Sequence, residues 1–265
     1  MAIEAETEQD RSKRHYQRTL FDGVAPLYEA SRLGYPTDIV EFAVTTAALG
    51  RHSRVLEVGC GTGQLTERLA GFGFSLTAID IGPSMVAEAR HRLNGPDVEF
   101  QVASFEDFPA AEASFDLIVS AAAFHWVDPE VRYRKSAQLL RPGGWLALLD
   151  ISEHYDDPFG AALRDMWVAR SDGRGAWVKR ATDTEVITGT GWFSEPIHRT
   201  YAQRMARPAD VVIGVENTRA TSLSWPDDVR RGFTEELAHH LELQRDVRLT
   251  QHTSVTMARI LRRPD

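Results

Sequence analysis

The 265-residue chain carries 30 basic and 38 acidic side chains, a formal net charge of −8, and 43% hydrophobic residues. This composition excludes a disordered or collagen-like chain and is sufficient for a sizeable buried core. A general nucleic-acid or anionic-membrane binder is disfavoured as well, because either needs a broad basic face. The one cysteine, Cys60, excludes a disulfide framework and a cysteine-rich zinc site. We therefore expect a small molecule as the partner, and no nucleic acid.

The polar start of the chain and the lack of long apolar runs predict where the protein works. Residues 1–14 contain no apolar segment of the kind found in secretory leaders, and they indicate a frayed or weakly helical arm. No run of about 18 apolar residues occurs in the sequence, which argues against a membrane span. We expect a cytoplasmic protein with no membrane partner, working as a monomer or homodimer.

Short apolar runs alternate with helical segments between residues 54 and 150. The runs are bounded by glycine, proline or aspartate and predict strands at residues 54–58, 75–79, 98–102, 115–120 and 145–150. Apolar residues at helical spacing lie between them, and Arg141-Pro142-Gly143-Gly144 signals a turn before the fifth strand. The alternation predicts a Rossmann-like, doubly wound α/β fold whose sheet is mainly parallel and has helices on both faces.

After residue 151 the regular alternation of strand and helix patterns ends. Residues 197–205 and 249–261 have strand-like composition and would complete a seven-stranded sheet. Residues 208–248, with Trp225-Pro226 as a helix-start signal, predict helices between these strands. We expect a single domain over residues 1–265. Its core would comprise about 37–151 and the two late strands, and its mostly helical, discontinuous cap would comprise about 15–36, 152–196 and 207–248.

A glycine-rich loop follows the first predicted strand. Residues 57–63 read Glu-Val-Gly-Cys-Gly-Thr-Gly and lead into a helix at Gln64. Glycines in such a turn let the backbone approach a ligand closely, and the helix beyond offers unpaired N–H groups. A dinucleotide fingerprint would need glycine or alanine at position 64. Gln64 therefore disfavours a nicotinamide oxidoreductase.

Asp80 ends the second predicted strand. A carboxylate at this position can accept two hydrogen bonds from a ribose diol. Glycine loop, helix and acid together predict a ligand that contains ribose.

Over residues 21–150 the chain resembles the class I S-adenosylmethionine-dependent methyltransferases, especially the type 11 small-molecule group. The resemblance implies S-adenosylmethionine as cofactor, S-adenosylhomocysteine as product and no metal. It implies that the glycine loop cradles the methionine part, that Asp80 holds the ribose hydroxyls, and that Glu57 steadies the loop and, through water, the amino group. The cofactor-binding residues that it implies are Glu57, Gly59, Cys60, Gly61, Gly63, Asp80, Ile81, Met85, Ser104, Phe105, Glu106 and Ala121.

The adenine side of this implied site departs from the family pattern. Ile81 and Met85 match residues that pack on the adenine faces, although ordinary core packing is the alternative. Ser104-Phe105-Glu106 matches the segment that contacts the adenine edge, but many relatives carry aspartate and alanine where this chain has Ser104 and Phe105. The hydrogen bond from position 104 to adenine is therefore in question.

The segment after the fourth predicted strand is the natural place for chemistry, because ligands of open α/β sheets bind beyond the carboxyl ends of the strands. Here it resembles the "FHW" stretch of the type 11 group, in which Ala121 would be a backbone contact. His125 is a candidate catalytic base or acceptor-orienting group, since its ordinary pKa lies near neutrality. The alternative is that His125 bonds a backbone carbonyl and Trp126 packs under the next helix.

Two segments are candidates for covering the acceptor. Residues 21–36 resemble the "Y…R.GYP" segment of type 11 enzymes, which makes Tyr28, Arg32 and Tyr35 candidate substrate-binding residues beside His125 and Trp126. Residues 152–195 carry further aromatic and basic side chains that would wall an apolar pocket or face an anionic acceptor, unless they form a solvated face: Trp167, Trp177, Trp192, Arg164, Arg170, Arg174, Lys179 and Arg180.

The sequence thus predicts a methyltransferase that uses S-adenosylmethionine and acts on a small-molecule acceptor by direct displacement. Such a reaction needs positioning and water exclusion more than a catalytic triad. The runner-up is a non-catalytic S-adenosylmethionine-binding regulatory or assembly protein.

Overall fold

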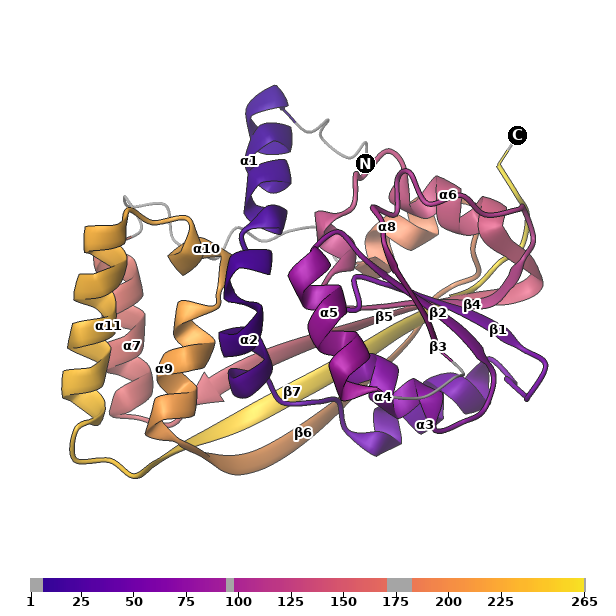
Figure 1. The fold of residues 1–265 in the computed structure, drawn as a ribbon. Coiled ribbons are helices and arrows are strands. Elements are labelled where there is room, and N and C mark those ends of the chain that lie inside the picture. The colour runs from indigo at the N-terminus through magenta and orange to yellow at the C-terminus, as the bar shows by residue number, and fades with distance from the viewer. Residues whose placement is uncertain (1–6, 94–97, 171–182, 265) are drawn as a thin grey trace.

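The computed structural model describes residues 7–93, 98–170 and 183–264. These residues form one seven-stranded mixed sheet with the strand order β3-β2-β1-β4-β5-β7-β6 (Figure 1). Its strands are β1 (Arg54–Val58), β2 (Ser75–Asp80), β3 (Val98–Val102), β4 (Phe115–Ala121), β5 (Leu140–Tyr155), β6 (Ile197–Pro208) and β7 (Asp246–Arg259). Strands β1 to β5 pair in parallel, whereas β7 lies antiparallel between β5 and β6. The prediction of a mainly parallel, seven-stranded doubly wound sheet is confirmed.

Helices cover both faces of the sheet because successive strand residues point to opposite sides. On one face, Leu56, Ile118 and Leu146 form a core with α6 and α8. On the other face, Val55 and Leu117 pack with α3 and α4. In chain order the helices are α1 (Glu8–Thr19), η1 (Asp22–Val24), α2 (Ala25–Ser31), α3 (Thr37–Thr46), α4 (Gln64–Ala70), α5 (Pro83–Arg92), η2 (Phe124–Trp126), α6 (Arg132–Leu139), α7 (Phe159–Ala169), α8 (Asp183–Thr190), α9 (Ala209–Asn217), α10 (Ala220–Leu223) and α11 (Asp227–Leu241). Within the described ranges, none of them is both long and apolar enough to cross a membrane.

Strand β5 is longer than the run predicted at residues 145–150. Leu140 already pairs with Phe115, and the register shifts before Trp145 pairs with Leu117. The predicted turn at residues 141–144 is therefore an irregularity inside the strand, where Gly143 adopts a φ of +83°. Beyond Asp150 the strand continues because β7 supplies an antiparallel partner for every residue to Tyr155. The antiparallel pair of β6 and β7, whose strands are connected through α9, α10 and α11, lies beside this extension (Figure 1).

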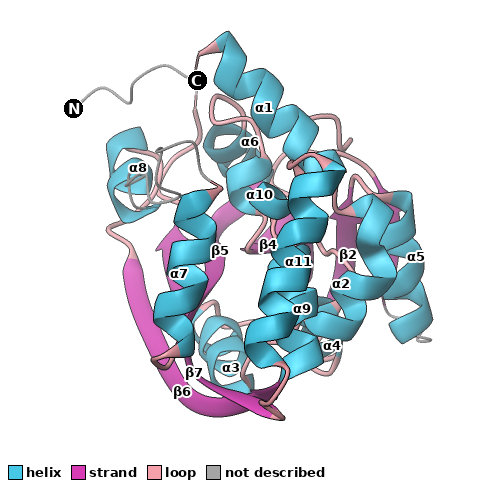
Figure 2. Ribbon diagram, turned by 90° about the vertical axis from the view of Figure 1, so that its left-hand side faces the viewer, coloured by secondary structure: helices cyan, strands magenta, loops and turns pink. Residues whose placement is uncertain are grey.

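The cap helices α7, α9 and α11 lie together over the ends of β5 and β7 (Figure 2). Phe233 and Leu237 of α11 are fully buried at the centre of this cluster. Trp167 belongs to it, with its ring centroid 5.2 Å from that of Phe233, whereas Trp192 packs against the core beneath α8. The expectation that these two tryptophans wall one pocket is therefore wrong.

The basic side chains of the same segment have partners or are not described. Arg170 pairs with Glu236 at 2.7 Å, and Arg164 lies 3.4 Å from Asp157. These two side chains form ion pairs with the protein itself. The remaining candidates of this segment, Arg174, Trp177, Lys179 and Arg180, lie outside the described residues.

The N-terminal arm is a helix from Glu8 onward rather than a frayed segment. Thr7 caps α1 by accepting a hydrogen bond from the Asp10 backbone N–H at 3.1 Å. Arg14 is buried and donates from Nη1 to the Trp126 carbonyl at 3.0 Å. The arm is thereby attached to η2, which follows the fourth strand.

Candidate functional site

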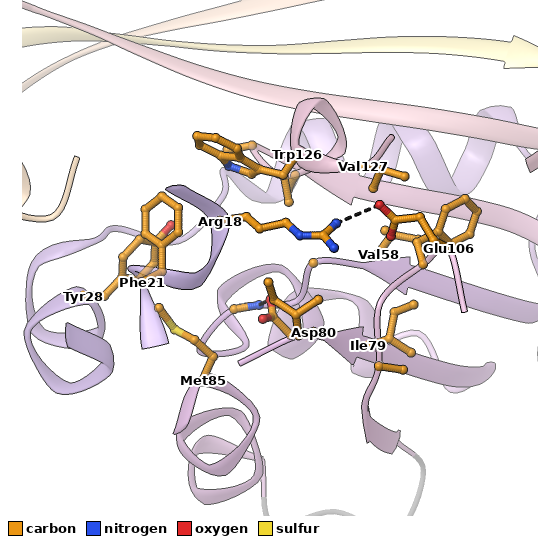
Figure 3. A pocket seen from close by; sticks show the side chains of 18 residues that line it. Arg18, Phe21, Tyr28, Val58, Ile79, Asp80, Met85, Glu106, Trp126 and Val127 are labelled. Carbon is orange, nitrogen blue, oxygen red and sulfur yellow. Dashed lines mark hydrogen bonds and ion pairs between the residues drawn. The ribbon is translucent and has the colours of Figure 1, made fainter. Parts of the chain in front are cut away.

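An open cavity lies beyond the carboxyl ends of β1, β2 and β4 (Figure 3). Strand β1 pairs with β2 on one side and with β4 on the other, so this is the point where the strand order reverses. The opposite side of the cavity is closed by the arm, by which we mean α1, η1 and α2. The lining residues are Arg18, Phe21, Tyr28, Val58, Gly59, Gly61, Ile79, Asp80, Ile81, Met85, Ala103, Phe105, Glu106, Ala121, Ala122, Ala123, Trp126 and Val127.

The glycine loop forms part of the cavity wall. Gly59 has a φ of +74°, and a Cβ at this position would lie 2.3 Å from the Cβ of Ala123. The backbone N–H groups of Gly59 and Cys60 both donate to the Ile79 carbonyl, at 2.8 and 3.0 Å. The loop therefore lies close against the ends of β2 and β4, and only glycine fits at position 59. Gly61 lines the cavity, whereas Gly63 is the N-cap of α4 and Cys60, within the loop, is buried.

Asp80 holds the loop in place and also faces the cavity. Its Oδ2 accepts a hydrogen bond from the Gly61 N–H and its Oδ1 accepts one from the Gly82 N–H, both at 2.9 Å. Burial raises the pKa of Asp80, and these backbone hydrogen bonds oppose the shift. Each carboxylate oxygen has a further lone pair. Asp80 can therefore accept hydrogen bonds from a ribose diol without releasing the loop.

Glu57 is a buried acid behind the loop. Its side chain is 1% exposed, and burial raises its pKa to about 8, against the effect of the nearby Thr66 hydroxyl. Its Oε2 is buried without a hydrogen-bond partner among the described residues. A buried acceptor without a partner is costly, and a cationic ligand group, directly or through water, would compensate it. Glu57 does not line the cavity, so an ammonium group bound there would interact with this acid only through water.

The residues predicted for the adenine side divide into two groups. Ile81, Met85, Phe105 and Glu106 line the cavity. Ser104 does not, because its hydroxyl donates to the Asp107 carboxylate at 2.7 Å and accepts from the Asp107 N–H at 3.1 Å.

The sequence analysis missed Arg18, and it predicted residues 21–36 to cover the acceptor without singling out Phe21 or Asp22. Arg18 donates from Nη1 to Glu106 Oε1 at 2.7 Å across the cavity (Figure 3). The Phe21 ring lies edge-on to Trp126 at 5.8 Å. Asp22 Oδ1 accepts from the Ser84 N–H at 2.7 Å, which joins η1 to the first turn of α5. These partners are far apart in the sequence, so no local pattern indicates the contacts.

The predicted acceptor-binding residues are not all at the cavity. Tyr28 and Trp126 line it. Arg32 instead donates to the Thr218 carbonyl at 3.1 Å, and Tyr35 is buried in the core on the α3 side. His125 is exposed and does not line the cavity, although its ring lies 4.6 Å from that of Trp126.

The acidic groups near the cavity do not form a metal centre. Within the described residues, no three His, Cys, Asp or Glu side chains are grouped so that they could hold a metal ion. Asp80 instead offers oxygen acceptors to hydroxyl groups. The arrangement is suited to an organic ligand with a ribose.

Known proteins share both the sequence of this region and the fold. The profile of the type 11 family described as "Methyltransferase domain" matches residues 56–148. An uncharacterized methyltransferase of Mycobacterium tuberculosis is 36% identical over 129 residues, which are 49% of this chain and 51% of the relative. A ubiquinone biosynthesis O-methyltransferase of Xanthomonas axonopodis pv. citri is 45% identical over 100 residues, 36% of this chain and 42% of the relative. The matches thus span about half the length of these curated relatives.

Among solved structures, a methyltransferase described as type II from Anaeromyxobacter dehalogenans shares the fold. The TM-score is 0.58 at 23% identity, over 87% of this chain and 99% of the other. This likeness covers more of the chain than the matched sequence does. At this identity it concerns the fold alone.

Proposed function

Because the chain carries a class I methyltransferase domain of the type 11 group, we propose that it transfers a methyl group from S-adenosylmethionine to a small-molecule acceptor. S-adenosylhomocysteine would be the product. The observation that carries the proposal is the cavity at the switch point, which the glycine loop and Asp80 line together, with the buried acid Glu57 behind the loop. Asp80 fits the ribose, and the loop backbone leaves room for the amino-acid end of this cofactor.

The residues present would hold each part of the cofactor. Asp80 would accept from the ribose hydroxyls, and Gly59 and Gly61 would let the backbone approach the methionine part. Ile81 and Met85 offer apolar contact to the adenine. When bound, the cofactor supplies a methyl group activated by a sulfonium centre. The remaining chemistry is positioning and exclusion of water, which the protein itself provides.

The acceptor would enter on the side of the arm and η2. Tyr28 and Trp126 line this side, and Phe21 packs edge-on against both rings, at 6.0 and 5.8 Å. Their rings would shield the reacting atoms from water. His125 stays a candidate base, for an acceptor that still carries its proton. Acting from its exposed position would require it to turn toward the cavity.

The proposal extends to the organisation of the chain. A single domain would comprise the cofactor-binding core, the late strands β6 and β7 that join its sheet, and a discontinuous cap. It would act in the cytoplasm as a monomer or homodimer, on an acceptor other than a nucleic acid.

Calorimetric titration with S-adenosylhomocysteine and with NADH tests the cofactor. We expect binding of S-adenosylhomocysteine, and a loss of about 2–4 kcal/mol in Asp80→Ala, because hydrogen bonds to a charged acceptor disappear. Binding of NADH alone would contradict the proposal, and an unchanged affinity in Asp80→Ala would remove the ribose role. Methyl-labelled cofactor incubated with a metabolite extract then tests transfer. Binding without any labelled product would favour a non-catalytic protein.

A further inference from the structure

At position 104, where many relatives carry an aspartate, this chain offers no side-chain partner for the edge of an adenine base. Ser104 occupies that position, but both hydrogen bonds of its hydroxyl go to Asp107, and it does not line the cavity. Recognition of the base therefore has to come from other side chains. The cavity wall on this side also contains Ala103 and Phe105, which offer only apolar side-chain contact.

Arg18 and Glu106 supply polar groups in the same wall. Glu106 Oε1 accepts from Arg18 Nη1 at 2.7 Å and from the Asp128 N–H at 3.1 Å. Lys135 donates to the Glu106 carbonyl at 2.9 Å, which fixes the backbone of the acid. The carboxylate is thus held firmly by one of its two oxygens.

The other atoms of the pair are left without partners. Arg18 Nε and Glu106 Oε2 are shielded from solvent, and neither forms a hydrogen bond among the described residues. Each would be costly to bury without a ligand. The pair therefore offers one N–H donor and one carboxylate acceptor in two side chains that line the cavity and are joined by an ion pair (Figure 3).

This pattern is complementary to adenine, whose edge presents a ring-nitrogen acceptor beside an amino donor. We propose that Arg18 and Glu106 together recognise the base of the cofactor, with Arg18 Nε donating to N7, which is an acceptor in adenine and hypoxanthine alike, and Glu106 Oε2 accepting from the amino group. The inference rests on the proposed function. It gives helix α1 a direct part in selecting the cofactor, and it explains how the chain can carry serine at position 104.

S-inosylhomocysteine tests whether the protein recognises the base. It carries hypoxanthine, which has a carbonyl where adenine has the amino group. In the wild type Glu106 Oε2 would face this carbonyl, acceptor against acceptor. We expect calorimetry to show at least about tenfold weaker binding than for S-adenosylhomocysteine. In Glu106→Gln the amide can donate to the carbonyl, so the preference should fall to about threefold or reverse.

Arg18→Ala tests the donor, and Arg14→Ala is its matched control. Arg14 lies one turn earlier on the same helix and also attaches α1, through the Trp126 carbonyl, but it does not line the cavity. We expect Arg18→Ala to weaken S-adenosylhomocysteine binding about tenfold or more and Arg14→Ala to weaken it less than about threefold. Circular dichroism checks that both variants fold.

The outcomes separate this inference from the function on which it rests. A wild type that binds neither nucleoside contradicts the proposed function itself. A wild type that binds both nucleosides equally overturns only the recognition of the base. Equal losses in Arg18→Ala and Arg14→Ala would likewise overturn it, because α1 would then act only as a cover.

Discussion

Glu57 shows how one buried side chain can couple ligand binding to pH. Its pKa of about 8 leaves it largely protonated at pH 7 in the ligand-free protein. An ammonium group bound nearby would stabilise the carboxylate and lower this pKa, which releases the proton. S-adenosylhomocysteine binding at pH 7 should therefore release up to about one proton, and the affinity should rise between about pH 6 and 8. Calorimetry in buffers of different ionisation enthalpy measures the protons released.

Glu57→Gln is the control for this coupling, because glutamine has the same shape and does not titrate. The variant should release no proton from this position. The folded-state pKa is raised, so the folded chain holds the proton between about pH 4.5 and 8 whereas the unfolded chain loses it. The free energy of unfolding of the wild type should consequently fall as the pH rises through this window, and less so in the variant. Equal proton release in both proteins would remove Glu57 from the site.

At the scale of elements, Asp22 joins the arm to helix α5. Gly82 is the N-cap of α5 and has no side chain to cap it, so Asp22 Oδ1 accepts from the Ser84 and Met85 N–H groups instead, at 2.7 and 3.2 Å. Asp22→Ala should cost about 1 kcal/mol of stability, as loss of a cap does. It should also speed amide hydrogen exchange in α1, α2 and the first turn of α5, because the arm loses this attachment.

Asp22→Asn is the matched variant, since its amide oxygen can still accept from the same N–H groups. Exchange in the arm should then stay closer to that of the wild type. If Asp22→Ala leaves exchange in α1 and α2 unchanged, the other arm contacts, such as that of Arg14 with the Trp126 carbonyl, are sufficient by themselves.

Elements that local patterns determine can be predicted from the sequence, whereas elements that depend on pairing with distant segments cannot. The parallel strands and the glycine loop follow from local patterns, because apolar runs and glycines at a strand end determine them within a few residues. The extension of β5 depends on pairing with β7, about a hundred residues later, so its own sequence does not mark its end. Likewise Asp80 is found from its place after a strand, whereas Arg18 reaches Glu106 across 88 residues.

The resemblance of residues 21–36 to type 11 enzymes also does not show which of their side chains face the acceptor. It identified Tyr28, Arg32 and Tyr35 as one group, but only Tyr28 lines the cavity. Arg32 faces the end of α9, a helix of the cap whose position the local sequence does not indicate. Motifs thus predict which residues lie near a site, while packing decides which of them face it.

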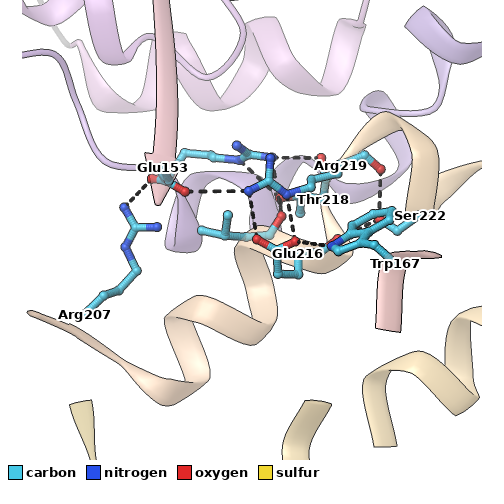
Figure 4. A network of polar contacts seen from close by, with 9 residues as sticks. Glu153, Trp167, Arg207, Glu216, Thr218, Arg219 and Ser222 are labelled. Carbon is cyan, nitrogen blue, oxygen red and sulfur yellow. Dashed lines mark hydrogen bonds and ion pairs between the residues drawn. The ribbon is translucent and has the colours of Figure 1, made fainter. Parts of the chain in front are cut away.

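At the scale of the whole molecule, buried charges join the cap to the extended sheet (Figure 4). Arg207 of β6 donates to Glu153 of β5 at 2.6 Å, and both side chains are less than a tenth exposed. Arg219 lies 3.8 Å from the same acid and forms two hydrogen bonds with Glu216 of α9, which also accepts from Trp167 at 3.0 Å. The network therefore connects two strands with α7, α9 and the segment after α9.

A double-mutant cycle on Glu153 and Arg207 tests what this network contributes. Arg207→Met leaves Glu153 buried with only the more distant Arg219, so the free energy of unfolding should fall by about 3–5 kcal/mol. Replacing both residues, with Glu153→Leu added to Arg207→Met, removes the uncompensated charge and should recover most of that loss, because apolar side chains of similar size can replace a buried pair. Urea unfolding measures each variant, and the m-value shows whether the cap still unfolds together with the sheet. A double variant no more stable than the single one would mean that Glu153 is held chiefly by Arg219, and that the cap is attached through α9 rather than through β6.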